Sequence, residues 1–139
     1  KIGEAISHYK MAIKLKPDFA IAHNDLGTTL FADRKTGEAI SHFKMAIELK
    51  PGYAAAHNNL GTLLLNAKMT EEAIDYYKEA IRIRPGFYVA HYNLGNALFQ
   101  KGEIKEAIDH YRETLKLKPD LVVAQKNLET ALLRSEELE

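Results

Sequence analysis

The sequence predicts an all-α fold, a right-handed α-solenoid (superhelix) of stacked antiparallel helix pairs with a C-terminal capping helix. The first observation behind this prediction is a period of 34 residues, which is typical of repeat architectures. The second is that apolar residues within each period recur at the spacing of one helix face. The period is kept by all four prolines, which are Pro17, Pro51, Pro85 and Pro119.

Each period contains two helices. His57, Leu60, Gly61 and Leu64 fall at i, i+3, i+4 and i+7, on one face of a first helix, and a second apolar stripe follows them. Proline cannot continue a helix, so the proline of each period marks the end of its second helix. The predicted helices span residues 2–15, 20–33, 36–49, 54–67, 70–83, 88–101, 104–117 and 122–136.

The turn inside each pair has its own signals. Thr70 is expected to be the N-cap of the helix that follows it, and Glu71 and Glu72 favour the positive end of that helix dipole. Gly102 interrupts the same turn one period later. The two helices of each period should therefore run antiparallel.

Glycine recurs in the middle of the first helix of each pair, although it costs about 1 kcal/mol there relative to alanine. This recurrence predicts that a partner helix passes close by, with a column of alanines as the facing surface. The glycines and alanines are Gly27, Gly61 and Gly95 with Ala39, Ala73 and Ala107.

Two aromatic columns keep the same period. The first is expected in the core, and it consists of Tyr9, Phe43, Tyr77 and Tyr111. The second follows the prolines, where it could plug the junction between periods or contact a ligand. It consists of Phe19, Tyr53 and Phe87.

Composition limits the function. Nineteen basic residues balance nineteen acidic ones, which argues against nucleic acid as the main partner. The chain has no cysteine, so disulfides and thiolate metal sites are excluded, and it has no apolar run long enough to span a membrane. Because residue 1 is lysine, we expect a fragment of a longer chain. The compartment is left open, with the cytoplasm as the default expectation.

The histidines do not predict a metal site. Equivalent positions on stacked helices lie about 8–10 Å apart or more, whereas zinc needs nitrogens about 2.0–2.1 Å from one ion. We therefore expect the histidines to fill packing slots, and we expect no cofactor. The two histidine columns are His23, His57 and His91, and His8, His42 and His110.

Catalysis is not indicated either. Serine and histidine are adjacent at Ser7–His8 and Ser41–His42, but neighbouring helical residues do not face each other. No glycine-rich phosphate loop or nucleophile elbow occurs. We therefore expect no catalytic residue in this chain.

The run AHNNLGTLL…EEAIDYYKEAIRIRP resembles the signature of the tetratricopeptide repeat family, which has Leu-Gly, alanine, aromatic and proline positions at set offsets. The style of the sequence is similar to prokaryotic members. The resemblance implies one array, residues 1–139, with a half repeat at 1–19, full repeats at 20–53, 54–87 and 88–121, and a capping helix at 122–139. Histidine replaces the usual tryptophan, and Gln125 and Glu129 depart from the pattern in the last helix.

Polar residues recur on the first helix of each pair, on a face separate from the Leu-Gly face. Asparagine favours caps and turns, so its recurrence inside helices needs a cause, which is either bonding within the scaffold or contact with a ligand. In the resembling family these positions line a concave groove, and an amide there can donate to and accept from a peptide backbone. The expected groove residues are Asn24, Asp25, Thr28, Asn58, Asn59, Thr62, Asn66, Tyr92, Asn93, Asn96, Gln100, Lys126 and Asn127.

These observations predict a scaffold that binds a peptide segment of a partner protein in the groove. Only Lys126 and Arg134 are basic there, which argues against a clamp for a terminal carboxylate. One alternative is a non-catalytic targeting arm of a larger enzyme, such as a glycosyltransferase, because the lining is similar to the asparagine-lined grooves of that subgroup. The other is self-assembly into homo-oligomers through the open N-terminal half repeat.

Overall fold

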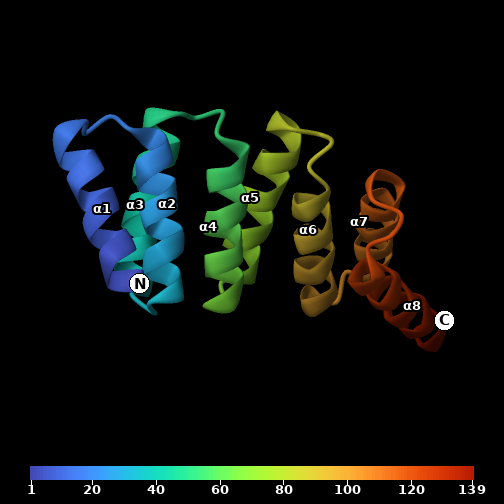
Figure 1. Cartoon of the computed structure of the whole chain (residues 1–139). Helices are drawn as coiled ribbons and strands as arrows, with labels where there is room; N and C mark the ends of the chain where they lie inside the picture. Colours follow the sequence, from blue (N-terminus) through green and yellow to red (C-terminus); the bar gives the residue numbers. More distant parts are fainter.

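The helices repeat with the period of the sequence. The computed structural model describes all residues from Lys1 to Glu139 and consists of eight α-helices (Figure 1). The all-α prediction is confirmed, and every predicted helix end lies within one residue of the observed end. The helices are α1 (Ile2–Leu15), α2 (Ala20–Ala32), α3 (Thr36–Leu49), α4 (Ala54–Asn66), α5 (Thr70–Ile83), α6 (Tyr88–Lys101), α7 (Ile104–Leu117) and α8 (Val122–Glu137).

The helices form an α-solenoid. The most extensive contacts join α2 to α3, α4 to α5 and α6 to α7, and each hairpin packs on the next through α3–α4, α5–α6 and α7–α8. The inner helices, α2, α4, α6 and α8, also contact one another in order, whereas the outer helices, α1, α3, α5 and α7, do not. The inner row is therefore the more closely spaced, so the concave face lies on it, toward the viewer in Figure 1.

One hydrophobic core runs along the whole stack. It contains 19 buried residues, from Ile6 in α1 to Ala131 in α8. A continuous core of this kind is what makes each hairpin depend on its neighbours, because no hairpin buries its apolar surface alone. None of the helices combines the length and the apolar character that crossing a bilayer demands.

The closest approach inside each hairpin is between a glycine and an aromatic ring. A Cβ added at Gly61 would lie 2.8 Å from the ring of Tyr77 on α5, which is shorter than a van der Waals contact. We expected the alanine column to face the glycines; Ala73 is fully buried, but the ring of Tyr77 supplies the nearest atoms, so that prediction was wrong in its partner. The other two pairs are Gly27 with Phe43 and Gly95 with Tyr111.

Three of the four residues in the first aromatic column lie in the core, as predicted, and each of the three packs against a glycine. Phe43, Tyr77 and Tyr111 are each no more than 2% exposed. Tyr9 in α1 has no such glycine opposite it and is half-buried.

The turn between hairpins is closed by a cation on an aromatic ring. The residue before each proline is extended, as steric contact with the proline ring requires, and at the first three junctions its cationic group lies over a ring of the second aromatic column. The ammonium of Lys50 lies 4.9 Å from the ring centre of Tyr53, and the guanidinium of Arg84 lies 4.7 Å from that of Phe87. These rings are half-buried at the junctions between repeats, and their role, plugging the junction or contacting a ligand, stays a prediction.

The turn inside each hairpin differs from its prediction at one residue. Met69 is the N-cap of α5, and Thr70 is the first residue inside the helix with no capping hydrogen bond, so the Thr70 prediction was wrong. Glu71 and Glu72 do occupy the first turn. Gly102 ends α6 with φ 93°, in the left-handed region where glycine has no steric penalty.

The last helix is built differently from the other inner helices. Glu129 occupies the position of Gly27, Gly61 and Gly95 and is exposed. An aromatic ring cannot pack over this position as it does over the glycines, because a side chain fills the space. The capping role of residues 122–139 stays a prediction that this substitution favours.

We predict that Gly61→Ala lowers the free energy of unfolding by about 1–3 kcal/mol, because the added methyl overlaps a ring that the core holds in place. The control is Gly37→Ala in α3, where nothing lies within 4 Å of the new Cβ and the better helix propensity of alanine should leave stability unchanged or raised. Urea unfolding followed by circular dichroism measures both variants. Equal stabilisation of the two would show that the ring contact does not restrict helix separation.

Candidate functional site on the concave face

Amide side chains of successive inner helices are hydrogen-bonded across the repeat boundaries. The Nδ2 of Asn59 in α4 donates to Oδ1 of Asn24 in α2 at 3.0 Å. The Nδ2 of Asn93 in α6 donates to Oδ1 of Asn58 in α4, also at 3.0 Å. At the third boundary a tyrosine hydroxyl takes the acceptor position, and Asn127 Nδ2 lies 3.1 Å from it. We call the six residues the asparagine ladder: Asn24, Asn58, Asn59, Tyr92, Asn93 and Asn127.

The ladder has a buried side and an accessible side. Asn24 and Asn58 are each 6% exposed, and their oxygens accept from the next repeat, so these two predicted groove residues hold the scaffold together. Asn59, Asn93 and Asn127 are only half-buried. Their Nδ2 atoms bond within the scaffold, while their Oδ1 atoms have no partner in the chain. Scaffold bonding, one of the two expected causes, therefore accounts for the donors and leaves the acceptors available.

Tyrosines of the core reach the same face. The hydroxyl of Tyr77 donates to Thr62 Oγ1 at 3.0 Å, and burial raises the pKa of Tyr77 to about 12, so the phenol keeps its proton. Asn96 replaces the threonine one repeat later, and the hydroxyl of Tyr111 donates to its Oδ1 at 2.7 Å. Burial raises the pKa of Tyr111 as well, and Tyr92 adds to the effect. Both phenols are therefore permanent donors near neutral pH.

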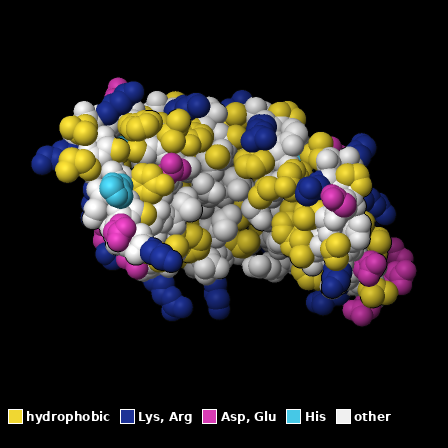
Figure 2. All heavy atoms as spheres, viewed as in Figure 1, with side chains coloured by type: hydrophobic (Ala, Val, Ile, Leu, Met, Phe, Trp, Pro, Cys, Tyr) yellow, Lys and Arg dark blue, Asp and Glu magenta, His cyan; other side chains and the backbone are white.

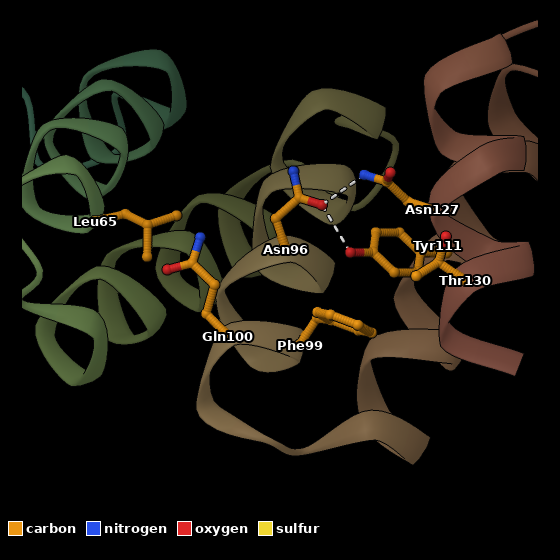
Figure 3. Close-up of a pocket in the computed structure, with 7 residues that line it drawn as sticks. All are labelled: Leu65, Asn96, Phe99, Gln100, Tyr111, Asn127 and Thr130. Atoms are coloured by element: carbon orange, nitrogen blue, oxygen red, sulfur yellow. Dashed lines mark hydrogen bonds between the residues drawn. The ribbon is translucent and has the colours of Figure 1, made fainter. Parts of the chain in front are cut away.

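A hollow of about 240 Å³ opens between α4, α6 and α8 (Figure 3). It contains three of the predicted site residues, namely Asn96, Gln100 and Asn127. Asn96 Oδ1 there accepts from both Tyr111 and the Nδ2 of Asn127, the latter at 3.0 Å. The full lining is Leu65, Asn96, Phe99, Gln100, Tyr111, Asn127 and Thr130.

The apolar part of this lining was not predicted. Leu65 is not among the predicted groove residues, but it is half-buried and lines the hollow. The period could have identified it, because one apolar column occupies this position in every inner helix and is at least partly accessible throughout. That column is Phe31, Leu65, Phe99 and Leu133.

The remaining predicted residues lie along the inner helices with differing exposure. Thr28 and Asn66 line a second hollow of about 690 Å³ between α2 and α4. The exposed members of the predicted set are Thr28, Asn66, Gln100 and Lys126. The half-buried members are Asp25, Asn59, Thr62, Tyr92, Asn93, Asn96 and Asn127.

Charge is sparse on this face. Figure 2 shows white and yellow atoms over the middle of the row of inner helices, with lysine, arginine and acidic side chains mostly toward the edges. The composition of the helices agrees with this view, because α2 and α4 together contain one residue of the Asp, Glu, Lys and Arg types, Asp25. A ligand that lies along α2 and α4 therefore meets mainly amides, hydroxyls and apolar groups.

The structure brings the two histidine columns together in pairs, which was not predicted from the sequence. In the α2–α3 hairpin, the Nε2 of His23 donates to the carbonyl of Pro17 at 3.0 Å, so its Nδ1 is the acceptor when the ring is neutral. The Nδ1 of His42 lies 3.1 Å away and must supply the proton. The α6–α7 hairpin repeats this arrangement with His91 and His110 at 3.2 Å.

The central hairpin lacks this bond. His57 is 6% exposed and donates to the carbonyl of Pro51, but its Nδ1 has no hydrogen-bond partner. Tyr76 stands where His42 and His110 stand in the other hairpins, with its ring centre 6.0 Å from that of His57. The prediction that the histidines fill packing slots is confirmed for His23, His57 and His91, with an unsatisfied acceptor in the middle one. It was wrong for His8, which is exposed.

Models of one repeat family match along the chain. Two models described as "Tetratricopeptide repeat" match residues 18–86 and 88–121, and one described as "TPR repeat" matches residues 1–33. Together they extend from residue 1 to residue 121. No curated protein is a significant match to the sequence.

Solved structures share the fold. A crystal structure of MamA has a TM-score of 0.89 at 27% identity and covers 97% of this chain and 79% of its own. A second MamA crystal structure has a TM-score of 0.84 at 28% identity, covering 94% and 71%. The first tetratricopeptide domain of Spaghetti (RPAP3), bound to the HSP90 peptide SRMEEVD, has a TM-score of 0.82 at 20% identity, covering 84% and 93%, and shows a likeness of fold alone.

We predict that Tyr76→His raises the free energy of unfolding by about 1 kcal/mol at pH 8, because a neutral imidazole there can donate to the orphaned Nδ1 of His57. Tyr76→Phe is the matched control, since it removes the hydroxyl without supplying a donor. Chemical denaturation of the three proteins makes the comparison. A gain in both variants, or in neither, would contradict the hydrogen-bond explanation.

We also predict that stability declines as the pH falls below about 6.5. The pKa values of His42 and His110 are lowered, mainly by burial and then by His23 and His91 respectively. A depressed pKa means that the unfolded chain takes up protons first, so the stabilisation is complete above the unfolded pKa and is lost as the pH falls through the folded one. Denaturation midpoints between pH 8 and pH 5.5 measure the slope. The double variant His42→Tyr with His110→Tyr copies the tyrosine of the central hairpin and should reduce the dependence of stability on pH. An unchanged dependence would exclude the two histidine pairs as its cause.

Proposed function

The chain belongs to the tetratricopeptide repeat family and has the architecture of a protein-interaction scaffold, and we propose that its concave face binds an extended peptide segment of a partner protein. The proposed role is non-catalytic. The observation that carries this proposal is the accessible side of the asparagine ladder, where one amide oxygen in each of α4, α6 and α8 has no partner in the chain.

The spacing of the ladder suits an extended backbone. Inner helices in contact lie about 8–10 Å apart, so the ladder presents one free acceptor at about this interval. An extended chain in the polyproline II conformation advances about 3.1 Å per residue with three residues per turn, so every third peptide N–H of the partner faces the same side and could donate to a ladder oxygen. Contacts to the backbone do not depend on the partner's side chains, so this part of the binding is tolerant of sequence.

The few charged residues on the concave face limit the kind of partner segment that it can bind. The peptide in the RPAP3 complex, SRMEEVD, ends in acidic residues. Here α2 and α4 carry no lysine or arginine, α6 carries Lys101 as its last residue, and α8 carries Lys126 and Arg134. We therefore propose a partner segment with few charges, rather than one with an acidic end.

The ladder supplies its own matched control for testing this proposal. Asn93→Ala and Asn58→Ala both break the same hydrogen bond between α6 and α4, but only the first removes the free oxygen of Asn93. A peptide selected by display against the whole chain serves as ligand, with affinity measured by isothermal titration calorimetry. We predict that Asn59→Ala with Asn93→Ala weakens binding by about tenfold or more, since a hydrogen bond contributes about 0.5–1.5 kcal/mol, while Asn58→Ala has a much smaller effect.

Two results would count against the proposal. Unchanged affinity for every selected peptide in the double variant would show that the ladder oxygens make no contact with the ligand. Equal losses in Asn93→Ala and Asn58→Ala would show that the ladder acts only by holding the repeats together.

A further inference from the structure

The hollow between α4, α6 and α8 distinguishes one repeat boundary from the others. Shifting its lining back by one period places Thr62 at the position of Asn96 and Asn93 at that of Asn127. Thr62 has a single polar atom, which accepts from Tyr77, also lies 3.5 Å from Asn93 Nδ2, and donates to the Asn58 carbonyl at 3.0 Å. The earlier boundary therefore lacks a free side-chain donor at the Thr62 position, whereas the later boundary has the amide nitrogen of Asn96 there.

The amide of Asn96 is held in one orientation. Its Oδ1 accepts from the hydroxyl of Tyr111 at 2.7 Å and from Nδ2 of Asn127 at 3.0 Å, so both scaffold bonds are on the oxygen. Figure 3 shows the nitrogen of Asn96 pointing away from these bonds, and the Oδ1 of Asn127 likewise outside the network. A free donor and a free acceptor therefore stand on adjacent helices, which is the pairing that the C=O and N–H of a peptide backbone require.

The walls of the hollow are uncharged, and they combine apolar groups with amides and hydroxyls. Leu65 lies on one side and the rings of Phe99 and Tyr111 on the other (Figure 3), and no Asp, Glu, Lys, Arg or His lines the space. Its volume of about 240 Å³ exceeds the roughly 150 Å³ of an apolar cavity that holds benzene, but falls short of the 300 Å³ or more of typical small-molecule sites. The space therefore fits one side chain with a ring.

We propose that this hollow is an anchor subsite that takes one uncharged aromatic side chain of the bound segment, with the adjoining peptide group held between Asn96 Nδ2 and Asn127 Oδ1. This inference rests on the proposed function and adds the residue class that sets the register of the partner. Aromatic rings pack against Phe99 and Tyr111 with a preferred geometry, whereas a charged side chain would lose its hydration with no counter-charge to meet it.

Blocked single amino acids test the subsite without knowledge of the partner. N-acetyl-L-phenylalaninamide carries the ring and the flanking peptide groups, N-acetyl-L-alaninamide lacks the ring, and N-acetyl-L-lysinamide adds a charge. In two-dimensional ¹H–¹⁵N spectra of the whole chain, the first compound should shift the side-chain amide signals of Asn96, Gln100 and Asn127 at least tenfold more effectively than the other two. Equal shifts from the alanine compound, or shifts confined to other residues, would overturn the proposal.

The chain also supplies the variants. Asn96→Thr recreates the arrangement at Thr62, where the hydrogen bond from the tyrosine hydroxyl is retained. This variant should bind N-acetyl-L-phenylalaninamide at least fivefold more weakly. Its thermal unfolding should be unchanged. Thr130→Trp, at an exposed position on the lining, should fill the hollow and abolish the shifts by a route that leaves the tyrosine bond untouched. Unaltered binding in both variants would rule the subsite out.

Peptides selected by display separate this inference from the proposed function. If their binding depends on Asn59 and Asn93, and they share an aromatic residue whose replacement by alanine costs as much affinity as Asn96→Thr, both proposals hold. If binding depends on the ladder but is indifferent to Asn96→Thr, the subsite is wrong and groove binding stands. If binding is indifferent to Asn59→Ala with Asn93→Ala, groove binding fails whatever the blocked amino acids do.

Discussion

The contact between a ring and a bare helix backbone sets the geometry of this protein. In each hairpin an aromatic side chain of the outer helix lies against a glycine of the inner helix, closer than any Cβ would permit. This contact determines the separation of the two helices, and it recurs with the 34-residue period, so the hairpins stack with one geometry. The stacking in turn places the inner helices close enough for their amides to bond across repeat boundaries.

The same aromatic residues connect the core to the concave face. Tyr77 and Tyr111 bury their rings and extend their hydroxyls to Thr62 and Asn96, whereas Phe43 in the first hairpin has no hydroxyl to extend. Hairpins that share one backbone geometry therefore present different polar groups to a ligand. Sequence differences at a few inner positions, rather than changes of fold, give the face its individual character.

The fold was predictable from the sequence because proline, glycine and the apolar stripe all act locally and all keep one period. The helix ends followed from them, and so did the burial of Phe43, Tyr77 and Tyr111. Pairings between helices were harder to predict. The bond between His23 and His42 joins two columns that the period keeps separate, and the position of Leu65 depends on how α4 meets α6. Helical spacing places a residue on a face but does not state which neighbour covers that face, so these contacts required the structure.

A repeat in the middle of the stack carries both the acceptor and the donor needed for its hydrogen bonds to the two neighbouring repeats. Asn58 supplies the buried acceptor for the helix after it, and the adjacent Asn59 supplies the donor to the helix before it. A duplicated copy of residues 54–87 would therefore bring a complementary joint at both ends, with no new interface to invent. The length of the concave face is in this sense modular. Tandem duplication in a gene could lengthen it while the hydrogen bonds between repeats stay the same.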